Sequence, residues 1–204
     1  MEEQMKSKRK WAIVGAAALV AVVTSGCGSA APGAAAVVGD ERISERELDE
    51  RVEQVLLAQG RPVDSASEAL VVTTLDRMIT TSLVEQFASR EGVEVTQGEL
   101  DAVVASYVEG SGGREAFEEL LLQQDLAPEG IEDLFRVNIL AQKLGVELDP
   151  AGSPESQTLA VLNAVSAFSA DIGTRVSPRY GTWDPSELTI GAVADDLSIP
   201  GTSS

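Results

Sequence analysis

Residues 64–92 read DSASEALVVTTLDRMITTSLVEQFASREG, and this stretch decides the fold. Its apolar side chains recur every four residues, at Val71, Leu75, Ile79, Leu83 and Phe87. That spacing places them on one face of an α-helix, which needs a partner surface to be buried against. Asp64, Ser65 and Ser67 are candidate N-caps of this helix. Gly92 is a favoured terminator, so the sequence predicts one long helix at the centre of the domain.

Capping boxes mark two further helix starts. In this motif a hydroxyl caps the helix, and a glutamate three residues later returns to the amide of the cap. One box pairs Ser44 with Glu47, and the other pairs Thr96 with Glu99. We therefore expect one helix that runs from the first box to about Gln59, and another that runs from the second box to a glycine-rich break.

Three more helices are predicted in the second half of the chain. A short one follows the glycine-rich break, and a longer one covers about residues 129–144, with Pro128 at a favoured first helical position. Residues 149–154 (DPAGSP) form a linker rich in proline and glycine. The last helix is expected from Pro154 to about Ile172.

Short strands are expected near both ends of the domain. Residues 35–43 are typical of two short strands joined by a tight turn, and residues 175–183 are typical of extended chain and turn. The predicted fold is therefore mainly α, with a small β element near the two ends of the mature chain. We assign the domain to residues 35–190, and expect a frayed tail over residues 191–204.

Residues 1–26 have the composition of a secretory signal peptide. A basic cluster precedes an apolar run of about 13 residues, Trp11 to Val23, which is too short to span a bilayer comfortably. Met5 gives a cleaner start than Met1, because two glutamates stand before the basic cluster. A retained membrane helix is the less favoured alternative, because residues 28–36 form a linker of small residues.

Cys27 is the only cysteine of the chain and follows Thr24-Ser25-Gly26. This arrangement resembles the bacterial lipobox, in which the cysteine is lipidated and becomes the mature N-terminus. The resemblance implies a lipid anchor, a flexible linker over residues 27–34 and a location on the outer face of the cytoplasmic membrane. The alternative is an ordinary small residue at the end of a signal peptide. Lipidation of Cys27 would leave the mature chain with no free cysteine for a disulfide framework.

The charge of the chain disfavours nucleic acid as a partner. The sequence has 15 Lys and Arg against 33 Asp and Glu, a formal net charge of −18. Such a chain repels phosphate backbones. It also lacks the basic surface with which peripheral proteins bind anionic membranes, so lipid is the expected route to the membrane.

The sequence offers little catalytic chemistry. It contains no histidine, which is the commonest general base and metal ligand. Lys143 is the only lysine after the signal peptide, and we expect it to contact carbonyl groups or solvent at a helix end. Neighbouring acids such as Glu132 and Asp133 are interpreted as solvated helix surface, and the glycine-rich break at residues 110–113 lacks the lysine of a phosphate loop. We therefore expect no enzyme activity, metal or cofactor.

Three motifs, in this order, resemble the SurA/PrsA group of extracytoplasmic chaperones and foldases. Residues 36–44 (AVVGDERIS) resemble the opening strand hairpin of that family, and residues 88–96 (ASREGVEVT) resemble its second-to-third helix junction. Residues 177–183 (SPRYGTW) resemble the closing segment, which in the family returns to complete the N-terminal chaperone domain. The resemblance covers roughly residues 35–190.

One departure from the family shapes the functional prediction. Many relatives carry a parvulin-type prolyl isomerase domain before the closing segment, whereas here residues 145–174, only about 30, occupy that place. A parvulin module is several times longer and uses active-site histidines. The resemblance thus implies the chaperone domain without the isomerase.

We therefore predict an ATP-independent chaperone, anchored by lipid, whose partners are unfolded or newly exported polypeptides. Tyr107, Phe117 and Leu121 flank the glycine-rich break and are the candidate client-binding residues. Tyr180 and Trp183 are expected to lock the closing segment onto the domain. The alternative is an accessory lipoprotein that uses the same fold to dock one folded partner.

Overall fold

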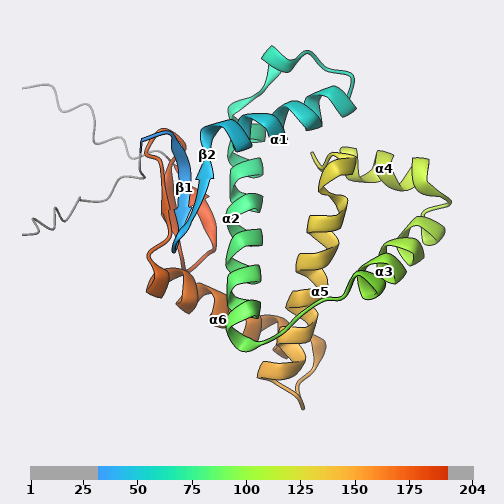
Figure 1. Cartoon of the computed structure of the whole chain (residues 1–204), viewed down its shortest axis with the longest axis vertical. Coiled ribbons are helices and arrows are strands. Elements are labelled where there is room, and N and C mark those ends of the chain that lie inside the picture. Colours follow the sequence, from blue (N-terminus) through green and yellow to red (C-terminus); the bar gives the residue numbers. More distant parts are fainter. Residues whose placement is uncertain (1–31, 193–204) are drawn as a thin grey trace, which may run out of the picture.

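The computed structural model describes residues 32–192, and helix α2 (Glu68–Glu91) is its central element. The side-chain oxygen of Ser67 caps the helix by accepting from the Leu70 amide, and Gly92 ends it with a left-handed φ of 71°. Figure 1 shows α2 upright, with strands on one side and α5 on the other. The predicted long helix and its buried stripe are confirmed by Leu75, Ile79, Leu83 and Phe87.

The chain enters α2 through a hairpin and a first helix. Strand β1 (Ala34–Val38) pairs with strand β2 (Glu41–Ser44), which leads directly into helix α1 (Glu45–Ala58). Ser44 and Glu47 form the predicted capping box at the start of α1. Secondary structure thus begins one residue before the predicted domain start at residue 35.

Two helices follow α2 on the far side of the domain from the strands. The predicted capping box of Thr96 opens helix α3 (Gln97–Gly110). The glycine-rich break then separates α3 from helix α4 (Arg114–Leu122). Figure 1 shows these two helices as an arm beside α5.

Helix α5 (Ile131–Leu148) differs from its predicted bounds at both ends. The predicted start near Glu129 was wrong, because Pro128–Gly130 form a separate 3-10 turn in which the Gly130 amide donates to Ala127. The predicted end at Leu144 was also wrong, since the helix continues through Gly145. A Cβ at that glycine would lie 3.0 Å from the Cβ of Gln157, so its absence lets α6 approach closely.

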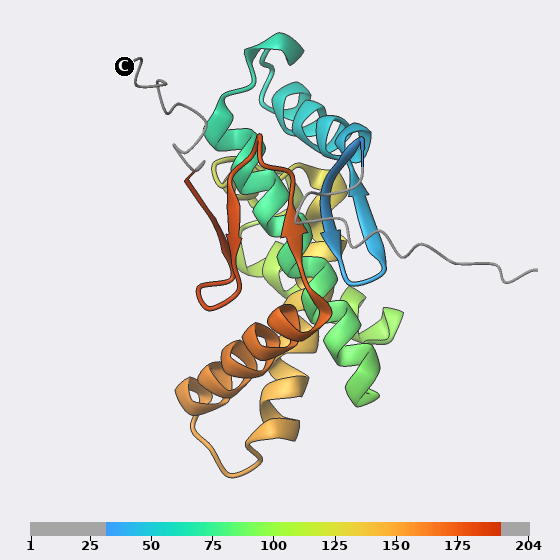
Figure 2. The same ribbon diagram turned by 90° about the vertical axis from the view of Figure 1, so that its left-hand side faces the viewer.

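Helix α6 (Pro154–Ile172) and the closing segment return the chain to its start. Strand β3 (Arg175–Val176) pairs antiparallel with β1, giving a three-stranded sheet of order β2-β1-β3. Strands β4 (Thr182–Asp184) and β5 (Thr189–Gly191) form a second, two-stranded sheet. Figure 2 shows all five strands over one side of α2. The mainly α fold with a β element built from both ends of the domain is therefore confirmed.

Buried polar contacts, as well as the pairing of its strands, hold the closing segment against the rest of the domain. The indole Nε1 of Trp183 donates to Oγ of Ser169 at 2.8 Å, and that hydroxyl donates to Thr174 Oγ1 at 3.0 Å. The Ile190 amide donates to the carboxylate of Asp76 on α2 at 2.9 Å. Tyr180 is buried too, so both aromatic residues expected to lock this segment do contact the core.

The buried residues form two clusters that meet at α5. The larger surrounds α2 and joins β1, α1, α6 and the closing segment. The smaller lies among α3, α4 and the first half of α5, and contains Leu100, Phe117, Leu121, Leu126, Ile131, Phe135 and Ile139. Because α5 contributes to both, it fixes the arm against the rest of the domain.

Several predictions fall outside the described residues. These are the signal peptide over residues 1–26, the lipidation of Cys27 and most of the tail assigned to residues 191–204. Strand β5 extends to Gly191, one residue past the predicted domain end. Among residues 32–192, no helix combines the length and apolar character that crossing a bilayer requires.

Replacement of Trp183 by alanine tests the lock on the closing segment. Trp183→Ala removes a buried indole together with its hydrogen bond, so the free energy of unfolding should fall by about 3–5 kcal/mol. Leu159→Ala is the control, because Leu159 is 60 % exposed on α6, and its effect should stay within about 1 kcal/mol. Chemical denaturation measures both, and equal losses would contradict the lock.

Candidate functional site

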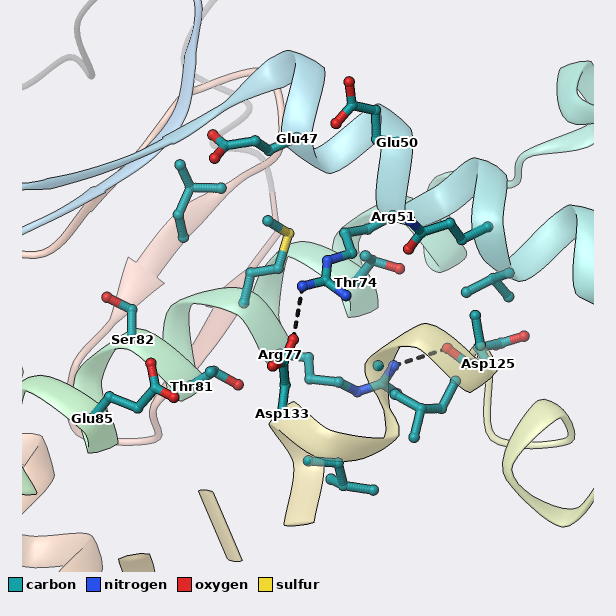
Figure 3. A pocket seen from close by; sticks show the side chains of 18 of the residues that line it. Glu47, Glu50, Arg51, Thr74, Arg77, Thr81, Ser82, Glu85, Asp125 and Asp133 are labelled. Atoms are coloured by element: carbon teal, nitrogen blue, oxygen red, sulfur yellow. Dashed lines mark hydrogen bonds and ion pairs between the residues drawn. The ribbon is translucent and has the colours of Figure 1, made fainter. Parts of the chain in front are cut away.

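A cleft of about 560 Å³ opens between α1, α2 and the start of α5. Figure 3 shows α1 above it, α2 along one side and α5 below. Its lining mixes charged groups with apolar side chains, which are Ile43, Val55, Met78, Leu126, Ala127 and Leu134. A cleft with both characters suits an amphipathic ligand, since apolar area and hydrogen-bonding groups are offered together.

An ion pair crosses the cleft from α1 to α5. The guanidinium Nη2 of Arg51 lies 2.7 Å from Oδ2 of Asp133, and both side chains are more than a third exposed. Exposed pairs contribute little to stability, so this contact positions the two walls more than it stabilises the fold. Figure 3 shows this contact between the Arg51 guanidinium and the Asp133 carboxylate.

A second arginine holds the loop between α4 and α5, which forms another wall. Arg77 of α2 donates from Nη1 to the Asp125 carbonyl at 2.8 Å, and from Nη2 to the Gln124 carbonyl at 3.0 Å. Gln59, the C-cap of α1, donates to the Leu122 carbonyl and to Asp125 Oδ1, each at 2.9 Å. Asp125 has a φ of 54°, a left-handed conformation that these bonds maintain.

Carboxylates outnumber bases around the cleft. It is lined by three arginines, Arg42, Arg51 and Arg77, and by six acids, so the formal net charge of the lining is −3. The acids are Glu41, Glu47, Glu50, Glu85, Asp125 and Asp133. Such a lining attracts cations and repels anions.

Five of these six acids have partners. Ser82 and Gln86 donate to Glu41, the capping box engages Glu47, and Arg46 pairs with Glu50. Asp125 and Asp133 are held as described above. Glu85 has no hydrogen bond or ion pair with any residue of the described part of the chain, residues 32–192.

The environment of Glu85 disfavours its charged form. The side chain is half-buried on α2, and the desolvation that results is the main cause of a raised pKa. The charges of Asp133 and Glu41 raise the pKa further, and Arg136 opposes them. Burial next to like charges costs stability, so Glu85 is a candidate for a group kept for binding.

Thr74 is a second unsatisfied group of the cleft. Its residue is 6 % exposed, and its Oγ1 has no hydrogen-bond partner within residues 32–192. Burying a hydroxyl without a partner costs about 1–3 kcal/mol. Thr74 lines the cleft on the same helix as Glu85, so both unsatisfied groups face one space.

The candidate client-binding residues lie elsewhere, in and over the smaller core cluster. Tyr107 and Phe117 both pack against Phe135, with ring centroids 4.8 Å and 5.8 Å away. Phe117 is 3 % and Leu121 8 % exposed, so in this structure both are core residues and offer almost no surface to a client. Tyr107 is 55 % exposed, and a role in client binding stays a prediction for it.

Lys143 makes the predicted carbonyl contact, but it lies before the last turn of α5 and not at the helix end. Its Nζ donates to the Glu94 carbonyl at 2.7 Å and lies 2.6 Å from Oε1 of Glu99. The contact of Lys143 with Glu99, together with the capping box of Thr96, lowers the pKa of Glu99 to about 2. Lys143 therefore ties α5 to the start of α3.

The cleft residues of α2 are absent from the sequence-based prediction. Thr74, Thr81 and Glu85 look like ordinary exposed positions of an amphipathic helix, because they lie beside the apolar stripe. The sequence signal that could have identified them is their spacing. Thr81 and Glu85 follow Thr74 by 7 and 11 positions, and residues at those separations share one face of a helix. Two threonines and a glutamate in that register mark a polar face that other elements enclose.

Comparison with known proteins gives a family match. The model of the SurA-like N-terminal domain family matches residues 1–145, which is more than half of the chain. No curated protein and no solved structure matches the chain.

Replacing Glu85 with glutamine tests whether its charge destabilises the fold. Because its pKa is raised in the folded state, the native protein binds more protons than the unfolded chain between the two pKa values, and stability falls as the pH rises through that window. Glu85→Gln should therefore raise the free energy of unfolding at pH 7 by up to about 1 kcal/mol.

This gain should disappear as the pH falls below the ordinary glutamate pKa of 4.5, where the wild-type carboxyl is protonated as well. Urea denaturation of both proteins across this pH range measures the difference. A stability loss at pH 7 would show that Glu85 has a stabilising partner.

Proposed function

The chain belongs to the family of SurA-like N-terminal domains, and from this premise we propose that it is an ATP-independent chaperone for exported polypeptides. The family implies binding of polypeptide substrates in general. The proposed activity is that of a holdase, which shields apolar segments of unfolded clients until they fold. The family match is the observation that carries this proposal.

The cleft supports the proposal by its chemistry. Met78 and Leu134, which are partly exposed, supply apolar contacts, while hydroxyl and carboxylate groups can bond to a peptide backbone or to polar side chains. Its volume of about 560 Å³ accommodates a short stretch of extended chain more readily than a folded domain. Binding at such a site needs no nucleotide, since clients exchange by ordinary dissociation.

The SurA N-terminal domain is a chaperone module, and the proposal assigns it no catalytic step. A chain without histidine also lacks the residues on which a parvulin-type isomerase depends in the relatives that carry one. We therefore place the function in reversible binding.

The proposal also includes a lipid anchor at Cys27. A tether of small residues would keep the domain close to the outer face of the cytoplasmic membrane, where exported chains emerge. Tethering raises the effective concentration of a weak binding site, so modest affinity for each client is sufficient. Strand β1 starts at Ala34, only seven positions after Cys27, which keeps the domain near the membrane surface.

An aggregation assay tests the holdase activity. The protein in lipid nanodiscs should suppress aggregation of several unrelated unfolded proteins at equimolar amounts and without nucleotide, with empty nanodiscs as the control. Light scattering measures the effect. Lack of suppression by a folded protein would exclude a general chaperone, and would favour the alternative of a lipoprotein that docks one folded partner.

Substitution of Cys27 tests the anchor. Cys27→Ala removes the only thiol that a lipid can be attached to, so we expect loss of acyl labelling and of the mass shift of the mature protein. Metabolic labelling with a fatty acid, followed by mass spectrometry, measures both. Acyl labelling that persists in the variant would contradict lipidation at this residue.

A further inference from the structure

The unsatisfied groups of the cleft lie along one stripe of α2. Thr74, Met78, Thr81 and Glu85 all line the cleft, at successive spacings of 4, 3 and 4 residues. Positions 11 apart on an α-helix differ by only about 20° around the axis, and by about 16 Å along it. Figure 3 shows Thr74, Thr81 and Glu85 following one another along α2.

The length of the stripe matches a short extended peptide. At about 3.3 Å per residue, a span of about 16 Å corresponds to about five residues of extended chain. Such a chain alternates its side chains and presents backbone donors and acceptors along its length. Thr74, whose buried hydroxyl has no partner within residues 32–192, lies at one end of the stripe, and the carboxylate of Glu85 lies at the other.

The charges of the cleft favour a cationic occupant. Each of the three arginines that line it already has a partner: Arg42 donates to the Pro32 carbonyl at 2.6 Å, Arg51 pairs with Asp133, and Arg77 donates to two backbone carbonyls. An anionic segment would meet a lining whose formal net charge is −3, and would be repelled by it. A lysine or arginine of the client would find at Glu85 a carboxylate that has no partner among residues 32–192.

Arg136 of the chain itself does not pair with Glu85. It is the arginine whose charge acts on Glu85, but no ion pair joins the two within the described residues, and its Nη2 donates to Gln97 of α3. A basic side chain of a client that reached Glu85 would thus make a contact that residues 32–192 do not supply.

We propose, on the premise that this domain binds unfolded polypeptide, that the cleft selects extended segments of about five residues that carry a lysine or arginine. The basic side chain pairs with Glu85, apolar side chains pack on Met78, and the backbone of the segment hydrogen bonds with the Thr74 hydroxyl. The substrate class of this chaperone is therefore cationic and apolar.

The test uses the full chain in nanodiscs of zwitterionic lipid, which do not themselves attract cationic peptides. The probes are three labelled peptides that share alternating valine and serine and differ at one position, which is lysine, glutamine or glutamate. Fluorescence anisotropy measures the dissociation constants. The lysine peptide should bind about tenfold more tightly than the glutamine peptide, and the glutamate peptide should bind most weakly.

Two pairs of variants test whether the preference for the lysine peptide arises in the cleft. Glu85→Gln should remove the preference for lysine over glutamine, whereas Glu119→Gln, on the exposed surface of α4, should retain it. Thr74→Val should weaken the binding of all three peptides severalfold. Thr73→Val, at the exposed neighbouring position, should leave their dissociation constants unchanged. Circular dichroism confirms that each variant is folded.

The outcomes separate this inference from the proposed function. Equal binding of the lysine and glutamine peptides would overturn the inference, and so would an equal loss of preference in Glu85→Gln and Glu119→Gln, which would indicate attraction to the net charge alone. If aggregation of unfolded proteins is still suppressed in either case, the chaperone proposal stands. If no peptide binds and aggregation is not suppressed, both fail.

Discussion

The burial of α2 on most of its sides is the constraint on which the structure depends. Leu75, Ile79 and Leu83 have no exposed surface, and strands, α1, α5 and α6 all supply parts of the layer that covers them. A helix of this length cannot be covered by its sequence neighbours alone. The two ends of the domain therefore return to it, and β1 pairs with β3 across its surface. The closing segment is held to α2 directly by the bond between Asp76 and Ile190.

This arrangement also explains where the cleft lies. The two core clusters meet at α5, but α1, α2 and the start of α5 do not pack together completely. Polar side chains of α2 face the space that remains, and two of them, Thr74 and Glu85, have no internal partner within residues 32–192. A fold selected only for stability would pair these groups or replace them with apolar residues. Their retention is consistent with a ligand that supplies the missing contacts.

The sequence predicted most of the fold, because its signals are local. Capping boxes at Ser44 and Thr96 and the four-residue apolar repeat of α2 specify helices without reference to the rest of the chain. The start of α5 lies two residues later than predicted, because residues 128–130 form a 3-10 turn before the α-helix begins at Ile131. The resemblance to the SurA/PrsA group, which the family match confirms, supplied the expectation that both ends join in one β element.

The candidate site was harder to predict, because it depends on packing between distant segments. Phe117 and Leu121 looked like groove residues next to a glycine-rich break, yet α3 and α5 cover them. Nothing in the sequence singles out Glu85, because the approach of α1 and α5 is what makes it half-buried. Sequence patterns show which face of a helix is apolar. They do not show which polar face another helix encloses.

Site-specific photo-cross-linking tests the central claim, that unfolded polypeptides occupy the cleft, most directly. A photoreactive benzoylphenylalanine at Thr81 lies inside the cleft, and the same group at Leu159 lies on an exposed apolar part of α6. The account predicts that unfolded clients cross-link at Thr81 and little at Leu159, and that a basic peptide competes for the first site. Cross-links that form equally at both positions, or mainly at Leu159, would contradict it.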